Sequence, residues 1–417
     1  MELTPEILGK KLRNARENRG LSQLDAATTL NIPRTAVSQI ESGNRTVSTL
    51  ELVKLAELYQ QSVADFFSDT PVEEEEALVA LHQVAPEVAE CAEIDNHIAH
   101  CLAICRDGVA LKKLLGRSLP ELPSYACAEM HSPMDAIQQG TRVAEQERQR
   151  LNLGGAPISD ITEVISNQGI WATQTELPEE MSGFFLRHRD IGMVIVVNLS
   201  STRARQKFSY AHEYGHALMD REYAVTITSS RNSRDLIEIR ANAFATAFLL
   251  PAHGVHEFLV WLDKGQKNSR ESEIFDVATE QPINIKSRTA PRAQTLTYQD
   301  IAKIAHHFRT SYRATTYRLQ NLKVISLKER NHLLEQEQYG REYLQFLKLD
   351  MTQEHDNLDP NSGVNQQIQN QVVYLAIEAY RRDEISRGRL YDIARSLNIK
   401  GKRLVALAGA ACEDVKC

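Results

Sequence analysis

The chain has 417 residues, of which 42% are hydrophobic and 25% are charged, and its formal net charge is -7. This composition is ordinary for a globular protein and excludes a disordered or fibrous chain, while the length allows several domains. A net negative charge excludes a polycation, so any nucleic-acid contact must be local.

The start of the chain and its cysteine content indicate in which cellular compartment the protein is expected. Residues 1–6 are acidic and no apolar segment follows them, so we expect no secretory signal. No run approaches the roughly 20 apolar residues that span a bilayer, so we expect no membrane partner. Six cysteines in a chain of this length do not form a disulfide framework. We therefore expect a cytoplasmic protein with reduced thiols.

Short amphipathic helices are expected at the N-terminus. Apolar spacing over residues 7–15 predicts the first helix, and Ser22 is placed to cap the second. Pro33 is compatible with the start of a third helix over residues 34–42, because its missing N–H is not needed there. A fourth helix is expected over residues 50–58. This succession is the helix-turn-helix plan.

The polar residues of the third helix are of the types that read DNA. Val37 and Ile40 should face the core, and four residues should then point outward: Arg34, Thr35, Ser38 and Gln39. Such side chains can form hydrogen bonds to base edges. Gln23 at a helix N-terminus and Arg45 just beyond the third helix are placed for phosphate contacts.

These residues resemble the Xre/Cro/lambda-repressor family. The resemblance rests on Gly20-Leu21-Ser22-Gln23 and on residues 33–45, and it extends to Ser68. It implies that the third helix enters the major groove of double-stranded operator DNA, with a homodimer reading two half-sites. Pro33 departs from the Ser or Thr cap that is usual there. A small helical domain with a polar surface and a protein-binding domain stay open as alternatives.

The next segment shows no motif with an evident chemistry. Four acidic residues, Glu73 to Glu76, mark a boundary, and we expect a helical linker over residues 71–137 with a connector around Pro120, Pro123 and Pro133. Three cysteines and two histidines in this linker could form a second metal site: Cys91, Cys101, Cys105, His97 and His100. Because no C-x-x-C pair is present, buried cysteines that act as small apolar residues are the favoured interpretation.

A metal-binding motif follows two expected helices, at 144–151 and 157–166, and two expected strands, at 183–186 and 193–198. A helix over residues 203–219 would carry His212-Glu213-Tyr214-Gly215-His216. Residues four apart share a helix face, so the two imidazoles could hold one ion while Glu213 handles a proton. Zinc suits these ligands and tolerates an open position at which water is activated.

A second helix offers a third ligand. It is expected over residues 235–249 and carries Glu238, with Asn242 one turn later on the same face. Glu238 could complete the metal site, and Asn242 could orient a ligand histidine.

The segments 205–216, 238–245 and 249–251 resemble the ImmA/IrrE metallopeptidase family, over about residues 138–255. The resemblance implies a zincin-like core in which His212, His216 and Glu238 bind Zn²⁺ and Glu213 is the general base. It also implies that the substrate is a transcriptional repressor, cleaved upon a stress signal. Tyr223 and His253 could stabilise the oxyanion, although structural roles for both stay open, as does a structural or inactive metal site.

The C-terminal third is expected to be helical. Two helices around Arg309-Thr310-Ser311 resemble a helix-turn-helix-like unit over about residues 295–326 of the kind that follows the peptidase core in that family. His306 and His307 lie on a basic stretch there, and both nucleic-acid contact and protein packing are open. Residues 357–370 are expected to form a loop, and residues 372–411 a helical segment that binds a ligand or dimerises.

Together these features predict a mainly α protein with a small β-sheet (α+β), divided at residues 1–70, 71–137, 138–262 and 263–417. The favoured function is a DNA-binding repressor with a zinc endopeptidase domain that cleaves itself or a regulatory protein. Single-stranded DNA, by family resemblance, or a small molecule would be the trigger. One alternative is a regulator whose peptidase-like domain is a silent sensor. Another is a peptidase that uses its N-terminal domain to locate a repressor.

Overall fold

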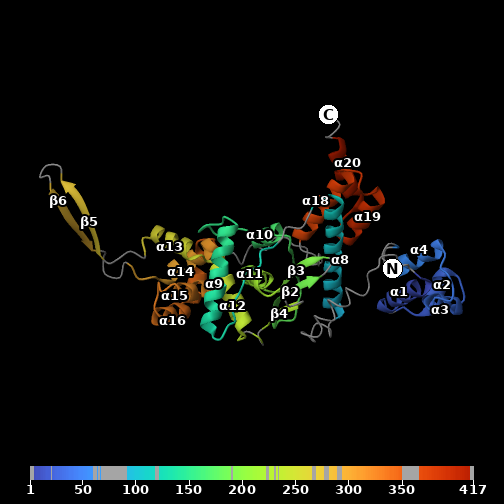
Figure 1. Ribbon diagram of the computed structural model, residues 1–417, viewed down its shortest axis with the longest axis horizontal. Helices are drawn as coiled ribbons and strands as arrows, with labels where there is room; N and C mark the ends of the chain where they lie inside the picture. The colour runs from blue at the N-terminus through green and yellow to red at the C-terminus, as the bar shows by residue number, and fades with distance from the viewer. Residues whose placement is uncertain are drawn as a thin grey trace.

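The structure is a computed structural model. It describes residues 4–19, 21–59, 63, 66, 92–117, 122–188, 191–221, 225–229, 232, 234–264, 269–276, 281–288, 294–349 and 366–413. The described chain is mostly helical, with one mixed four-stranded sheet and one two-stranded hairpin (Figure 1). This confirms the expected α+β fold class.

The N-terminal bundle includes four fully described helices: α1 (Pro5–Asn18), α2 (Gln23–Leu30), α3 (Arg34–Glu41) and α4 (Thr49–Tyr59). Ser22 caps α2 as expected: its hydroxyl accepts from the Asp25 N–H at 3.3 Å, and the Asp25 carboxylate accepts from the Ser22 N–H at 2.7 Å. Pro33 precedes α3 without a side-chain cap bond. The bundle encloses its own apolar core, which includes Leu12, Val37, Ile40, Leu52 and Leu55.

The central sheet has the strand order β1-β3-β2-β4. Its strands are β1 (Trp171–Thr175), β2 (Met181–His188), β3 (Gly192–Asn198) and β4 (Val225–Ser229). β1 pairs with β3 in parallel, whereas β2 runs antiparallel to both β3 and β4. The two predicted strands correspond to β2 and β3, while β1 and β4 were not predicted and form the edges.

One face of the sheet is covered by helices that include the motif helix. They are α9 (Pro133–Arg150), α10 (Ile161–Asn167), α11 (Arg203–Met219) and α12 (Leu236–Leu249). Phe185, Ile195 and Val197 of the sheet pack in one core with Ala211 and Tyr214 of α11. The bounds of α11 are those that the sequence predicted.

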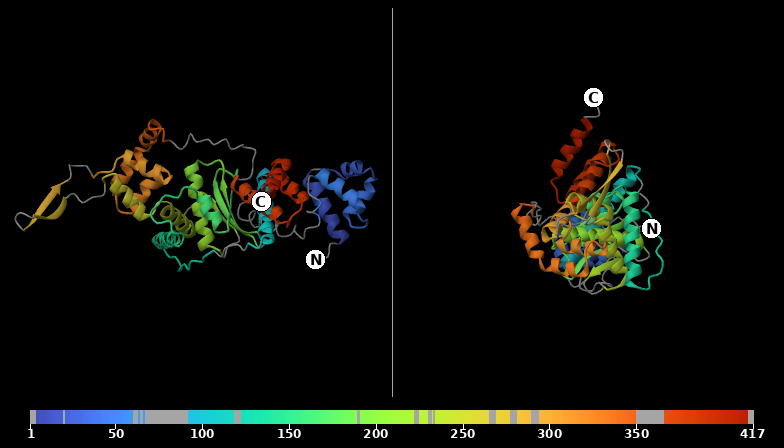
Figure 2. Two further views of the ribbon diagram at one scale, coloured as in Figure 1. Left: turned by 90° about the horizontal axis from the view of Figure 1, so that it is seen from above. Right: turned by 90° about the vertical axis from the view of Figure 1, so that its left-hand side faces the viewer.

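The other face is covered by helices from two distant parts of the chain. α8 (Ala92–Leu114) lies beside α18 (Gln366–Arg381) and α19 (Arg387–Ser396), and α20 (Gly401–Glu413) packs on α18 and α19, as Figures 1 and 2 show. Asp107 of α8 forms an ion pair of 2.6 Å with Arg389 of α19. Phe184, Leu186, Val194 and Val196 pack into this second layer. Because both sheet faces are buried, β2 and β3 are apolar on both sides.

The cysteines of α8 bear on the question of a second metal site. Cys101 and Cys105 are buried in the apolar core, and His100 binds the Ser396 carbonyl oxygen through Nε2 at 2.7 Å. Within the described residues, these side chains do not belong to a metal-ligating cluster. Cys91 lies outside the described residues. The structure therefore agrees with small buried side chains for Cys101 and Cys105.

Several expected boundaries were wrong. α9 begins at Pro133, where the sequence predicts a connector, because Ser132 caps the helix through the Asp135 N–H at 3.2 Å and proline suits a first helical position. α10 covers residues 161–167 rather than 157–166. The expected loop is helical over residues 366–370, while its remainder and the acidic run at 73–76 lie outside the described residues.

The remaining elements are α13 (Ala252–Trp261), the hairpin of β5 (Ser269–Asp276) and β6 (Gln281–Arg288), α14 (Tyr298–Phe308), α15 (Tyr312–Asn321), α16 (Leu327–Glu335) and α17 (Glu337–Phe346). α14 and α15 are the two predicted helices around residues 309–311. Thr315, Thr316 and Arg318 of α15 are buried, and Arg318 donates to the Leu250 carbonyl oxygen at 2.9 Å. These contacts favour protein packing over nucleic-acid contact for α15.

Among the described helices, none is both long and apolar enough to cross a bilayer by itself. α12 and α13 reach that length and composition only as a pair bent by 42°.

Candidate metal centre

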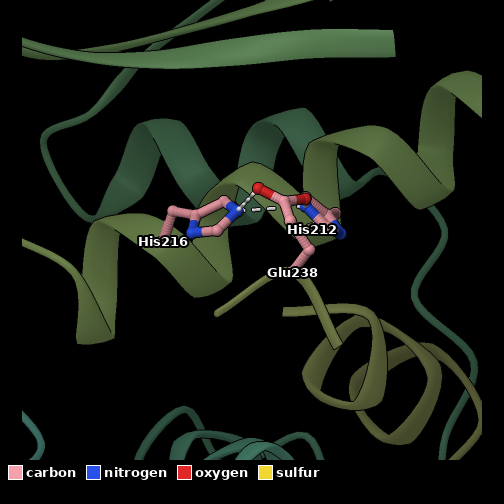
Figure 3. A group of neighbouring side chains, drawn as sticks. All are labelled: His212, His216 and Glu238. Carbon is pink, nitrogen blue, oxygen red and sulfur yellow. Dashed lines mark hydrogen bonds and ion pairs between the residues drawn. The ribbon is translucent and has the colours of Figure 1, made fainter. Parts of the chain in front are cut away.

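Two helices bring three ligand-type side chains together. α11 presents His212 and His216 on one face, and α12 places Glu238 against them (Figure 3). The two Nε2 atoms lie 3.0 Å apart, and the Glu238 oxygens lie 3.1 Å from Nε2 of His212 and 3.6 Å from Nε2 of His216. All three side chains are buried, and they are the metal-ligating cluster found among the described residues.

The outer nitrogens of both histidines are held by oxygen atoms. Nδ1 of His212 lies 3.0 Å from Oδ1 of Asn242, and Nδ1 of His216 lies 2.8 Å from Oδ2 of Asp220. An acceptor at Nδ1 keeps a proton there, so a ring that gives up its Nε2 proton to make room for a metal directs the Nε2 lone pair toward Glu238. Two lone pairs and a carboxylate therefore converge on one point, and this donor set fits a divalent cation.

The electrostatics of the cluster favour positive charge at that point. Burial by itself would lower the pKa of His216, but hydrogen bonds to Asp220 and Glu238 outweigh it and raise the pKa to about 10. Burial likewise opposes ionisation of Glu238, but hydrogen bonds from the two histidines lower its pKa to about 2. Asp220 is held in turn by Arg240 of α12. A cation between the three side chains would experience the same attraction.

Glu213 is fully buried beside the cluster. Oε1 accepts a hydrogen bond of 2.6 Å from the Thr228 hydroxyl of β4, whereas Oε2 is buried and has no partner among the described residues. A Cβ atom at Gly183 would lie 3.3 Å from Oε1, so this glycine of β2 leaves room for the carboxylate. Burial raises the pKa of Glu213, which suits a group that must accept a proton.

Gly215 permits the close approach of the second helix. A Cβ atom there would lie 3.0 Å from the Phe244 ring of α12, closer than ordinary packing distance. The glycine therefore helps to bring Glu238 to the two histidines.

Comparison with known families separates the chain into two matched parts. Residues 12–66 match the helix-turn-helix family model, and residues 165–281 match the peptidase M78 model, described as an IrrE N-terminal-like domain. The chain joins a helix-turn-helix domain to an IrrE-type peptidase domain. The second match contains His212, Glu213, His216 and Glu238. Comparison with curated proteins gave no match. Both resemblances drawn from the motifs are thereby confirmed, and the first domain marks the protein as a DNA-binding regulator.

The helix-turn-helix domain presents four predicted DNA-reading residues on one exposed surface: Arg34, Thr35, Ser38 and Gln39. Val37 and Ile40 of the same helix are buried in the domain core. These exposed α3 residues are available to a partner.

The two predicted phosphate-contacting residues have partners within the domain. Gln23 donates to Glu41 at 2.9 Å, and Arg45 forms an ion pair of 2.7 Å with Glu51. Glu41 is itself buried in an ion pair of 2.6 Å with Arg16. Contacts of Gln23 and Arg45 with phosphate would therefore compete with these bonds.

Three residues of the centre were missed by sequence reasoning. Asp220 follows His216 by four residues, so helical periodicity could have revealed it. Thr228 lies on the unpredicted strand β4, and Arg240 is aimed by the packing of α12 on α11, so neither had a local signal. Of the two proposed oxyanion donors, His253 is exposed and pairs with Glu257 at 3.3 Å, and Tyr223 lies outside the described residues.

Proposed function

We propose that this protein is a transcriptional repressor whose IrrE-type domain is a zinc-dependent endopeptidase. The observation that carries the proposal is the convergence of His212, His216 and Glu238 beside the buried carboxylate of Glu213. Zinc takes imidazole and carboxylate ligands and keeps an open position in catalytic sites. When bound, zinc would supply Lewis-acid polarisation of the scissile carbonyl and activation of water.

Glu213 would move the proton. Oε2, which has no partner among the described residues, would accept a proton from water and later deliver it to the leaving amine. Thr228 would hold Oε1 and so fix the direction of Oε2. Asn242 and Asp220 would orient His212 and His216 through their Nδ1 atoms.

Strand β4 supports a peptide as the substrate. It is the edge strand next to β2, and its Thr228 contacts Glu213. An extended peptide that paired with a sheet edge would present its backbone in regular register. A peptide on β4 would thus run past the proton-transferring carboxylate.

The tethering of the two domains supports a regulatory role. A homodimer would hold operator DNA through the exposed α3 residues, and proteolysis of the protein itself or of another regulator would relieve repression in the cytoplasm. A stress or DNA-damage-like signal, such as single-stranded DNA or a small molecule, would trigger cleavage.

The enzyme proposal is tested with Glu213→Gln. The amide keeps the size of the side chain and leaves the three zinc ligands in place, so metal content should be retained. Cleavage of the chain or of a co-expressed regulator should fall by about 10²–10⁴-fold, and derepression should be lost. Glu257→Gln, an exposed change of the same type, is the control. Unchanged cleavage and derepression in Glu213→Gln would refute the enzyme proposal. If derepression were lost in His212→Ala but retained in Glu213→Gln, the domain would be a silent sensor that needs the metal site but not the catalytic carboxylate.

The DNA-reading proposal is tested with Arg34→Ala combined with Gln39→Ala. Each base contact contributes about 1–3 kcal/mol, so the double variant should lose tenfold or more in affinity for its operator. Binding is measured at one fixed salt concentration, because phosphate contacts depend on salt. Lys54→Ala removes an exposed charge from α4 and should leave specific binding largely intact. Equal specific binding by the double variant and wild type would refute the assignment.

A further inference from the structure

A cavity of about 480 Å³ lies at the junction of α13, α14 and the end of α17. Its wall includes Phe258 and Trp261 from α13, His307 and Lys303 from α14, and Leu347 just after α17. None of these residues takes part in the metal centre. The volume is within the range of pockets that bind small molecules.

The aromatic part of the wall is a stacked platform. The Phe258 and His307 rings are stacked with centroids 4.3 Å apart, and the Trp261 ring lies 5.1 Å from Phe258. Trp261 is 73% exposed, which is unusual for so large an apolar side chain. Burial and the neighbouring His306 lower the pKa of His307, so this ring is a neutral stacking surface.

The polar part of the wall carries positive charge. Lys303 and Arg309 both line the cavity, and its described lining includes no carboxylate. His306 also lines it, and its Nδ1 atom is buried and has no hydrogen-bond partner among the described residues. Cations near the end of a helix also stabilise the helix, but that role explains neither the exposed tryptophan nor the unpartnered Nδ1.

A planar ring can stack on the platform while an anionic group reaches the two cations. Tryptophan favours stacking with a planar ring, and arginine favours contacts with an anionic group. We propose that this cavity binds a small ligand with a planar ring and a negatively charged group, of the class of a nucleoside monophosphate. The proposal does not depend on zinc or on peptidase activity.

The cavity is also linked to the motif helix. Lys207 of α11 is buried and donates to the carbonyl oxygens of Phe308 at 2.9 Å and of Ile158 at 2.7 Å. Phe308 is the last residue of α14, between the cavity residues His307 and Arg309. A ligand in the cavity would therefore contact the same helix end that Lys207 ties to α11.

The full-length chain offers a direct binding measurement. Trp171 and Trp261 are its two tryptophans, and Trp171 is buried in the core. Titration with AMP or GMP should quench the fluorescence of Trp261, and calorimetry should report the same dissociation constant. In Trp261→Phe the fluorescence change should disappear, and calorimetric binding of AMP should weaken because phenylalanine offers a smaller stacking surface than tryptophan. Inorganic phosphate and adenosine, which each lack one half of the ligand, should bind at least about tenfold more weakly.

Charge variants decide whether this cavity is the site. Lys303→Gln with Arg309→Asn should weaken AMP binding by about tenfold or more, since asparagine tolerates the left-handed backbone at residue 309. Lys328→Gln, an exposed change on α16 outside the cavity, should not alter it. The proposal is overturned if no nucleoside monophosphate binds at millimolar concentration, or if the double variant binds as wild type does. It is equally overturned if phosphate alone binds as well as AMP, or if a short oligonucleotide binds and free nucleotides do not.

Discussion

His216 and Asp220 are one helical turn apart on α11, with Nδ1 of His216 2.8 Å from Oδ2 of Asp220. The other oxygen of the Asp220 carboxylate binds Arg240, which follows Glu238 by two residues on α12. This carboxylate therefore orients one histidine and also ties together the two helices that supply the proposed ligands.

Asp220→Asn should weaken zinc binding by about 10–100-fold, because an amide is a poorer acceptor for the Nδ1 proton and loses the charge that holds Arg240. The measurement is competition with a chromophoric chelator on the full chain. Asp235→Asn makes the same chemical change at an exposed residue before α12, where no side-chain cap bond is formed. Equal zinc affinities of Asp220→Asn and wild type would show that the Asp220–His216 contact does not support the metal.

Gly140→Ala should disturb the centre from a distance. A Cβ atom at Gly140 of α9 would lie 2.2 Å from the Arg240 carbonyl oxygen and 2.9 Å from the Phe244 nitrogen, so α12 would have to move. We expect a loss of about 1–3 kcal/mol in the free energy of unfolding, together with weaker zinc binding, because α12 carries Glu238. Denaturant unfolding and chelator competition measure the two effects.

The matched control is Gly409→Ala in α20, where no atom of the described residues lies within 4 Å of the added Cβ. This change should be neutral or should stabilise the chain by up to about 1 kcal/mol, since alanine favours helix. If both alanine variants behaved alike, close packing of α9 on α12 would not be the reason for a glycine at position 140.

The part of the candidate site that could be predicted from the sequence depends on the helical repeat. The helix repeat places His212 and His216 on one face, and it also relates Glu238 to Asn242. The structure brings all four side chains together, with His212, His216 and Glu238 buried and Asn242 half-buried. The third helix of the N-terminal bundle was predictable for the same reason, because Val37 and Ile40 define its buried face.

What could not be predicted depends on contacts between distant segments. α8 and the helices α18–α20 share one core with the sheet, yet no local pattern says that residues near 100 pack against residues near 390. Strand β4 is short and exposes part of its surface, so it lacked the apolar run that identified β3. Pro133 was misplaced because proline interrupts a helix interior but is favoured at its first position.

Ile393→Ala tests whether the C-terminal helices belong to the core of the sheet. Ile393 is fully buried in the cluster that also contains Trp171, and its truncation should cost about 2–5 kcal/mol. Unfolding is followed by Trp171 fluorescence in a Trp261→Phe background, so that the signal comes from the sheet. Leu407→Ala in α20, where the side chain is 53% exposed, is the control and should change the stability little. A Trp171 transition unaffected by Ile393→Ala would show that the C-terminal layer unfolds independently.

Lys207 should make the stability of the chain depend on alkaline pH. Burial lowers its pKa from an ordinary value of 10.5 to about 8. Below pH 8 both the folded and the unfolded chain hold the proton, so Lys207 contributes no pH dependence there. Between pH 8 and 10.5 the folded chain releases the proton while the unfolded chain keeps it, so the free energy of unfolding rises with pH. Over this interval the free energy of unfolding can rise by at most about 3 kcal/mol.

Denaturant unfolding of wild type and Lys207→Met between pH 8 and 10.5 isolates this contribution, because the other titrating groups are common to both proteins. The difference between the two should grow with pH in favour of wild type, whereas Lys328→Met, exposed on α16, should follow wild type throughout. A constant difference between wild type and Lys207→Met would mean that Lys207 keeps its proton when buried and that its two carbonyl contacts hold a full charge.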